Sequence, residues 1–218
     1  MSSSLLKCRL PRLYPILDAG LLLRAGLSIE GFARELRHAG IRFLQYRDKE
    51  ATDDVVQQRA ALLRTIFSDG CLILNDRVSL VAATRCDGIH VGQEDLSPAQ
   101  TRATLGPEVL IGVSTHGEDQ LRRATHSPAD YIAIGPVFAT ASKLDPDPVV
   151  GLEGVRAARA MTTKPLVAIG GINRSNCAVV IHAGADSVAV ISDLIPRPGS
   201  STGKLVEEFL AALSDHAR

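Results

Sequence analysis

The sequence has no tryptophan and no surplus of charge of either sign. Its 218 residues contain 24 Lys and Arg against 24 Asp and Glu, with only five Phe and three Tyr. Proteins that bind nucleic acids carry a basic face, and those that bind single strands add aromatic platforms for the bases. The composition therefore argues against a nucleic-acid-binding protein.

Long hydrophobic runs and paired cysteines are missing as well. No window approaches the ~20 apolar residues of a membrane-spanning helix, and the N-terminus lacks the apolar core and cleavage site of a secretory signal. Cys8, Cys71, Cys86 and Cys177 form no CxxC pair and have no histidine at the spacing of a zinc site. We therefore expect four reduced thiols, no membrane association and a cytoplasmic location.

What the sequence does contain is a regular alternation of short apolar runs and helical patterns. The apolar runs occupy residues 13–17, 41–46, 71–74, 88–91, 110–113, 131–134, 166–169 and 187–191. Several are apolar on both faces, which is typical of parallel strands covered by helices. Eight such units in 218 residues favour a single-domain (β/α)8 TIM barrel of the α/β class over an open doubly wound sheet. We expect one domain over residues 1–218, with residues 1–11 as a flexible N-terminal extension.

The segment from Ile41 to Lys49 shows where the barrel interior becomes polar. Ile41, Phe43, Gln45, Arg47 and Lys49 have the same parity, so an extended strand places them on one face. The polar end of this face carries two cations. Because catalytic residues of such barrels lie at the carboxyl ends of the strands, we expect Arg47 and Lys49 to bind an anion there.

Two aspartates follow neighbouring strands at the same predicted rim. Asp76 comes after the run at 71–74, and Asp95 ends the segment HVGQED after the run at 88–91. Hard oxygen ligands of this kind suit Mg2+, with phosphates and water completing its coordination. The alternative is that Asp76 caps the next helix and Asp95 is a solvated turn residue. Ser97-Pro98 already provides a helix start, so we favour a magnesium site.

A second anion site is expected at the last two strands. Gly170-Gly171 follows strand seven, ahead of a helix expected at Arg174, and Ile191-Ser192 follows strand eight. Barrels of this class commonly bind phosphate there through backbone N–H groups and a helix N-terminus. Thr140, Ser142 and Lys143 form a hydroxyl-rich cationic cluster on the loop 135–151, which either folds over a ligand or is simply solvated.

No set of Ser, His and Asp, or of Cys and His, has an order that suggests covalent catalysis. His90 and His116 lie at strand ends, but a lone histidine is more often a packed or exposed residue than a catalyst. Two anion sites, one of them metal-assisted, indicate an enzyme that joins two phosphorylated molecules or displaces a phosphate group.

Seven segments, in order and at successive strand ends, resemble the thiamine phosphate synthase family. They are QYRDK, ILNDR, DGIHVGQEDL, GVSTH, GPVFATASK, AIGGI and AVIS, and they cover the chain from Leu13 to about Leu194. The resemblance implies a TIM barrel that joins 4-amino-2-methyl-5-(diphosphooxymethyl)pyrimidine to a thiazole phosphate and releases pyrophosphate. Mg2+ is the implied cofactor, and two small molecules are the implied partners.

The resemblance also assigns roles to residues. Catalysis would involve Arg47, Lys49, Lys143 and Ser114, because cations and Mg2+ stabilise the charge that grows on departing pyrophosphate. Asp76 and Asp95 would hold the metal. The pyrimidine diphosphate would be bound by Gln45, Arg47, Lys49, Asn75, Ser114 and Lys143, and the thiazole phosphate by Thr140, Ser142, Gly171, Ile191 and Ser192.

The sixth loop departs from the family pattern Pro-Thr-x-Thr-Lys. Ala139 stands in place of the proline and Ser142 in place of the second threonine, which keeps the hydroxyl but puts the rigidity of the loop in doubt. Two other functions stay open. One is a thiazole tautomerase of the same barrel family, with His116 moving a proton; the other is a non-catalytic regulator that binds thiamine precursors. A homo-oligomer is also compatible with the sequence.

Overall fold

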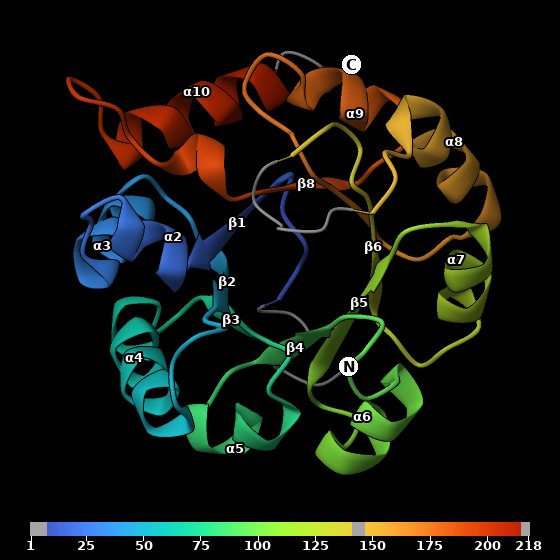
Figure 1. The fold of residues 1–218 in the computed structure, drawn as a ribbon, viewed down its shortest axis with the longest axis horizontal. Helices are drawn as coiled ribbons and strands as arrows, with labels where there is room; N and C mark the ends of the chain where they lie inside the picture. Colours follow the sequence, from blue (N-terminus) through green and yellow to red (C-terminus); the bar gives the residue numbers. More distant parts are fainter. Residues whose placement is uncertain (1–7, 141–146, 215–218) are drawn as a thin grey trace.

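A closed barrel of eight parallel strands forms the centre of the molecule, surrounded by a ring of helices (Figure 1). The structure is a computed structural model and describes residues 8–140 and 147–214. Neighbouring strands in the sequence are neighbours in the barrel, and β8 pairs with β1 to close it. The prediction of a single-domain (β/α)8 TIM barrel of the α/β class is confirmed.

The elements follow the predicted order closely. The strands are β1 (Leu13–Asp18), β2 (Phe43–Arg47), β3 (Cys71–Asn75), β4 (Gly88–Val91), β5 (Leu110–Thr115), β6 (Tyr131–Ile134), β7 (Leu166–Ile169) and β8 (Ser187–Val190). The helices are α2 (Ala19–Arg24), α3 (Ile29–His38), α4 (Asp53–Ile66), α5 (Val81–Thr84), α6 (Pro98–Leu105), α7 (Glu118–Thr125), α8 (Gly151–Met161), α9 (Cys177–His182) and α10 (Thr202–Ser214), with 3-10 turns η1 (Val78–Leu80) and η2 (Ser192–Leu194).

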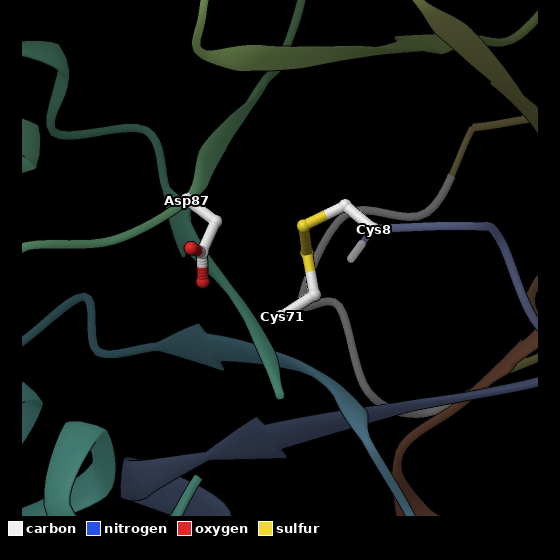
Figure 2. A group of neighbouring side chains, drawn as sticks. All are labelled: Cys8, Cys71 and Asp87. Carbon is white, nitrogen blue, oxygen red and sulfur yellow. A yellow bond between two sulfur atoms is a disulfide. The ribbon is translucent and has the colours of Figure 1, made fainter. Parts of the chain in front are cut away.

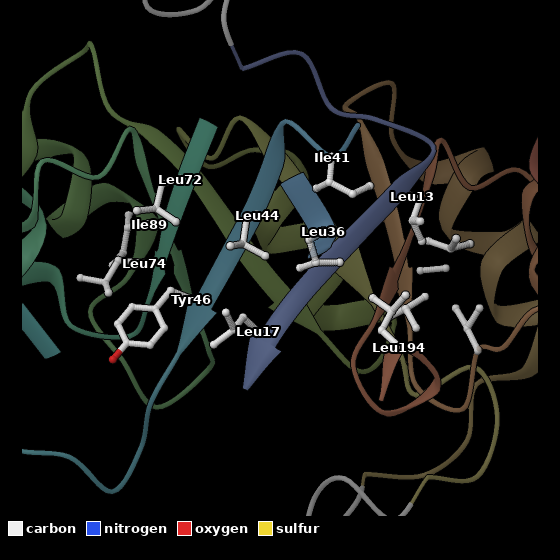
Figure 3. Packing of buried hydrophobic residues seen from close by; sticks show 14 of the residues in the cluster. Leu13, Leu17, Leu36, Ile41, Leu44, Tyr46, Leu72, Leu74, Ile89 and Leu194 are labelled. Atoms are coloured by element: carbon white, nitrogen blue, oxygen red, sulfur yellow. The ribbon is translucent and has the colours of Figure 1, made fainter. Parts of the chain in front are cut away.

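Strand pleating divides the buried residues into two cores. Leu17 and Leu44 point outward and pack under the helices (Figure 3), where each fully buried leucine contributes about 1.5–3 kcal/mol. Tyr14, Phe43 and Tyr131 point inward and fill the barrel axis. The inward positions beyond this plug are polar on β1 and β2 and apolar on β7 and β8, so the plug forms the floor of a mixed site at the carboxyl ends of the strands.

The expected parity of β2 fails at its first residue. Ile41 lies before the strand and packs in the outer core. Its N–H donates to the carbonyl of Leu36 in α3 at 3.0 Å, which ties Ile41 to the helix end. Phe43, Gln45 and Arg47 keep the predicted inward face, whereas Lys49 lies past the last residue of β2 but still lines the cavity.

A repeated ion pair holds the opposite, N-terminal end of the barrel. An aspartate lies just before each of the strands β4, β6 and β8. Its carboxylate accepts a hydrogen bond from a backbone N–H near the start of the preceding strand and forms an ion pair with an arginine on a helix. The pairs are Arg64 with Asp87 at 2.5 Å, Arg102 with Asp130 at 2.6 Å and Arg159 with Asp186 at 2.8 Å. Each arginine also donates to carbonyls of the loop that follows its helix. Such charge-assisted bonds position the loops at this end.

The prediction of four reduced thiols is wrong for two of them. Cys8 and Cys71 form a disulfide with a Cα–Cα separation of 5.2 Å (Figure 2). Cys86 and Cys177 are free and buried. The two sulfurs lie 63 residues apart in the sequence, and spacing alone gives no sign that folding brings them together. Residues 1–7 of the expected flexible extension lie outside the described residues, whereas Cys8 is buried and anchored to the first residue of β3.

Asp87 lies beside this disulfide, and the three side chains come within the range of metal ligands (Figure 2). The sulfurs are bonded to each other, and the Asp87 carboxylate already accepts from Leu72 N and Arg64. Cys8, Cys71 and Asp87 therefore contribute to the packing at the N-terminal end of the barrel. In the described part of the chain, no helix is both long and apolar enough to cross a membrane.

Candidate active site

A cavity of about 450 Å³ opens at the carboxyl ends of the strands. The sequence-predicted site residues that line it are Gln45, Arg47, Lys49, Asn75, Asp76, Asp95, Ser114, Thr140, Gly171, Ile191 and Ser192. Ser142 and Lys143 lie outside the described residues. The barrel thus brings together side chains that are spread over the sequence from residue 45 to residue 192.

Arg47 is held in the cavity wall by a partner that the sequence analysis missed. Asp18 ends β1 in register with Arg47, and the two side chains form an ion pair. The other Asp18 oxygen accepts from Leu21 N at 2.8 Å and caps α2. Tyr14, Ile16 and Asp18 alternate inward just as Phe43, Gln45 and Arg47 do, so the parity rule applied to the first strand would have found Asp18.

Asp76 occupies an unusual backbone conformation at the end of β3. Its φ is +64°, a region that costs a non-glycine residue about 1 kcal/mol. Its carboxylate pairs with Lys49 Nζ at 2.8 Å. The 3-10 turn that follows begins after Arg77 and has no side-chain cap, so the alternative of Asp76 as a helix cap is wrong.

Asp95 follows β4, and its carboxylate lies next to that of Asp76, which follows the neighbouring strand β3. Burial raises the pKa of Asp95, the neighbouring Asp76 carboxylate raises it further, and the Gly92 N–H and Lys49 lower it. The helix after Asp95 is capped by Ser97 in a capping box with Gln100, so Asp95 is not needed there. Two converging carboxylates that repel each other form an arrangement that a cation stabilises; this donor set fits Mg2+.

The two glycines after β7 allow close approach of the sixth loop. Gly170 and Gly171 have φ of +98° and +63°. A Cβ on Gly171 would lie 2.5 Å from the carbonyl oxygen of Ala139, so only glycine fits between this loop and β7. The predicted helix start at Arg174 is wrong: α9 begins at Cys177. Asn173 is the reason, because its side chain accepts from Ser175 N at 2.9 Å and holds a turn instead.

The barrel plug contains a hydrogen-bonded network that the sequence analysis did not predict. His90 Nδ1 lies 3.0 Å from Tyr131 Oη, and His90 Nε2 lies 2.9 Å from Ser114 Oγ. Tyr14 Oη lies 2.9 Å from Tyr131 Oη and accepts from Gln45 Nε2 at 2.8 Å. Burial lowers the pKa of His90 to about 4 and raises the pKa values of both tyrosines. These residues occupy inward-facing positions of their strands, and this period-two pattern was the signal in the sequence that could have identified them.

His116 lies on the cavity wall at the end of β5. Its Nδ1 lies 2.6 Å from the carbonyl oxygen of Gly135, which makes Nδ1 the protonated nitrogen. Its Nε2 lies 3.5 Å from the Asp147 carboxylate on the sixth loop. The ring is therefore oriented by groups of the loop that follows β6.

Comparisons with known proteins agree with this geometry. A family model described as thiamine monophosphate synthase matches residues 13–194. The thiamine-phosphate synthase of Koribacter versatilis is 47% identical over 202 residues, covering 91% of this chain and 96% of that protein. The thiamine-phosphate synthase of Chloroflexus aurantiacus is 40% identical over 186 residues, covering 84% of this chain and 85% of that protein.

A solved structure agrees in the same way. The thiamine phosphate pyrophosphorylase of Pyrococcus furiosus superposes with a TM-score of 0.83 at 29% identity, covering 95% of this chain and 97% of that one. The matched residues 13–194 include every site residue that the barrel brings to the cavity. This chain belongs to the thiamine monophosphate synthase family.

Proposed function

We infer that the protein is a thiamine-phosphate synthase, a transferase that joins 4-amino-2-methyl-5-(diphosphooxymethyl)pyrimidine to a thiazole phosphate. The bond between the pyrimidine methylene carbon and the diphosphate oxygen breaks, and its electron pair leaves with pyrophosphate. The thiazole nitrogen then forms the new C–N bond. The observation that carries this proposal is the convergence of two cations, Arg47 and Lys49, and two carboxylates, Asp76 and Asp95, on one wall of the cavity.

The leaving group is proposed to bind along β2. Arg47 at the end of β2 and Lys49 just after it both line the cavity, and Lys143 is assigned to the same diphosphate by family resemblance. Asp18 uses one edge of the Arg47 guanidinium, which leaves its other donors for phosphate oxygens. Positive groups placed where negative charge develops lower the barrier to bond cleavage.

The pyrimidine ring is proposed to lie above the barrel plug. Gln45, Asn75 and Ser114 line the cavity, and Gln45 and Ser114 are both held from below by the buried network. These side chains would orient the ring so that its methylene carbon faces the thiazole nitrogen. Ser114 is also counted among the catalytic residues, because its hydroxyl would contact the ring during ionisation.

Asp76 and Asp95 are proposed to hold Mg2+. Burial and, to a lesser degree, the neighbouring Asp76 carboxylate raise the pKa of Asp95, and this supports a cation between the carboxylates. The ion would supply positive charge to the pyrophosphate oxygens. Lys49, already paired with Asp76, would hold its ammonium group at the same end of the leaving group.

The thiazole phosphate is proposed to bind at the opposite side of the cavity. Thr140, Gly171, Ile191 and Ser192 line that side, and Ser142 is assigned to it by family resemblance. Gly171 brings its backbone against the sixth loop, so backbone N–H groups and hydroxyls are available for a phosphate. The site would thus separate the two phosphorylated substrates by charge: cations and metal for the diphosphate, neutral donors for the monophosphate.

The test is product formation with both substrates. Purified protein with Mg2+ should release pyrophosphate and form thiamine phosphate, which is detected by fluorescence after oxidation to thiochrome phosphate. Tight binding of both substrates without product would refute the synthase assignment and favour the regulator. Isomerisation of a thiazole phosphate without pyrophosphate release would instead favour the tautomerase, for which His116 is the candidate.

Asp95→Ala tests the metal site. We expect kcat to fall by about 100-fold or more, the size of effect seen when a group that stabilises developing charge is removed. Asp119→Ala is the matched control, since Asp119 is an exposed carboxylate on α7. Equal turnover in the two variants, with unchanged circular dichroism spectra, would mean that the metal assignment is wrong.

Location and assembly stay predictions. The disulfide removes one argument for a cytoplasmic location, because four reduced thiols were part of it. Size-exclusion chromatography with light scattering would test for a homo-oligomer.

A further inference from the structure

Five side chains form one hydrogen-bonded chain across the inside of the barrel. It runs from Gln45 to Tyr14, Tyr131, His90 and Ser114, with successive distances of 2.8, 2.9, 3.0 and 2.9 Å. The first four are buried, with exposed fractions of 2%, 1%, 2% and 8%. Gln45 and Ser114, the two ends, both line the cavity. The chain therefore connects two points of the site through the barrel plug.

A glycine on the neighbouring strand β5 makes room for the Tyr131 ring. A Cβ on Gly112 of β5 would lie 2.0 Å from the ring carbon that bears the Tyr131 hydroxyl. Gly112 therefore leaves the space that the phenol occupies. Its hydroxyl is thereby fixed between Tyr14 and His90.

Counting protons gives the chain a direction. Gln45 Nε2 donates to Tyr14 Oη, so the Tyr14 proton is directed to its other partner in the described structure, Tyr131. Tyr131 then donates to His90 Nδ1, which must be unprotonated. His90 Nε2–H donates to Ser114 Oγ, and the Ser114 proton is left for the cavity.

This order makes the two ends opposite in hydrogen-bonding character. Gln45 keeps its Oε1 as an acceptor, while Ser114 offers a donor. A flip of the Gln45 amide would reverse every bond in the chain, so that Gln45 would offer a donor and Ser114 an acceptor. Gln45 and Ser114 therefore exchange donor and acceptor character together, and neither can do so alone while the hydrogen-bonded chain is intact.

Resting on the proposed function, we propose that Tyr14, Tyr131 and His90 are positioning residues that determine specificity for an amino-substituted pyrimidine. Its amino group donates to Gln45 and a ring nitrogen accepts from Ser114, which matches the direction of the chain. An oxo group in place of the amino group requires Gln45 to flip. The lactam proton of the oxo form lies on the ring nitrogen beside the oxo group, so the distal ring nitrogen, the one assigned to Ser114, still accepts. The flip turns Ser114 into an acceptor as well, and unpaired buried polar groups oppose binding.

The binding test uses two diphosphates, the 4-amino pyrimidine and its 4-oxo counterpart, titrated calorimetrically with Mg2+ and without the thiazole phosphate. Wild-type protein should prefer the amino form by at least about tenfold. Tyr131→Phe breaks the chain, lets Gln45 flip alone, and should reduce the preference to less than about threefold. Tyr14→Phe breaks it at a second point and should do the same if Tyr131→Phe fails to fold. Tyr46→Phe is the matched control, since its hydroxyl bonds to Asp48 outside the barrel plug.

The spectroscopic test reads the direction itself. Nitrogen-15 NMR of labelled histidine, with the signal assigned through its loss in His90→Gln, should show the Nε2–H tautomer of His90 in the wild-type protein. The Nδ1–H tautomer, or a preference for the amino form that survives in both Tyr131→Phe and Tyr14→Phe, would overturn the inference. If the wild-type protein makes thiamine phosphate in either case, the synthase function stands; if it binds neither diphosphate, the proposed function itself has failed.

Discussion

Reduction of the Cys8–Cys71 disulfide is expected to destabilise the barrel from the end opposite the cavity. The bridge spans 63 residues, and the loop-entropy relation gives about 4 kcal/mol for a loop of this length. Cys71 is fully buried and Cys8 nearly so, so the disulfide is packed inside the N-terminal end of the barrel. For a chain of this size, 4 kcal/mol corresponds to a fall of roughly 8–16 °C in Tm.

The assay is urea unfolding followed by circular dichroism, with and without reductant. Wild-type protein should lose about 4 kcal/mol in free energy of unfolding on reduction. Cys8→Ser should match the reduced wild type and should not respond to reductant. Thiol titration of unfolded protein should find two free thiols, Cys86 and Cys177, before reduction.

Two results would refute this reasoning. One is the titration of all four cysteines in unfolded protein that has never met reductant, since it would mean that Cys8 and Cys71 are thiols. The other is an equal free energy of unfolding for oxidised wild type and Cys8→Ser. Product formation should be the same in both proteins below their unfolding temperatures, because the disulfide does not line the cavity.

Three further predictions concern the site and its support. Burial lowers the pKa of His90 to about 4, so as the pH falls the unfolded chain binds a proton at this histidine before the folded protein does. The folded state therefore loses about 3 kcal/mol of stability between about pH 6.5 and about pH 4, and keeps it above about pH 6.5. Unfolding followed against pH should therefore be steeper in the wild type than in His90→Gln. Gly112→Ala should lower the free energy of unfolding by at least about 1–3 kcal/mol, measured by thermal melts, because its Cβ would overlap the Tyr131 ring. Asp18→Asn keeps the helix cap but loses the ion pair with Arg47, and should raise the KM for the pyrimidine diphosphate by roughly 10- to 100-fold in steady-state assays.

Matched variants separate these effects from general damage. Gly117→Ala places a Cβ with no atom within 4 Å and should leave the Tm nearly unchanged. Equal melts for Gly112→Ala and Gly117→Ala would contradict the packing explanation. An unchanged KM in Asp18→Asn would mean that Arg47 does not depend on its partner. Parallel pH profiles for wild type and His90→Gln would mean that His90 does not titrate as its burial requires.

The strands and the rim were readable from local pattern. Period-two alternation identified the inward face that carries Gln45 and Arg47, and the same rule holds for Tyr14 and Asp18 on β1. Asp76 and Asp95 were found because each follows an apolar run at a strand end. These features follow from chain geometry, since pleating and the parallel order of the strands place every strand end on one rim.

Other features depend on contacts between distant parts of the chain. The Cys8–Cys71 disulfide joins residues 63 apart in the sequence, and no local pattern indicates it. The ion pair of Asp18 with Arg47 likewise depends on the register of β1 and β2.

The amino-acid sequence by itself determined the barrel, the rim of strand ends and many of the residues that line it, because these depend on periodicities of two and 3.6 within short segments. Tertiary structure decided which distant side chains meet. It joined Cys8 to Cys71 and linked Gln45 to Ser114 through three buried rings. The physical reason is that barrel closure fixes distances across the axis, and no local pattern in the sequence encodes them.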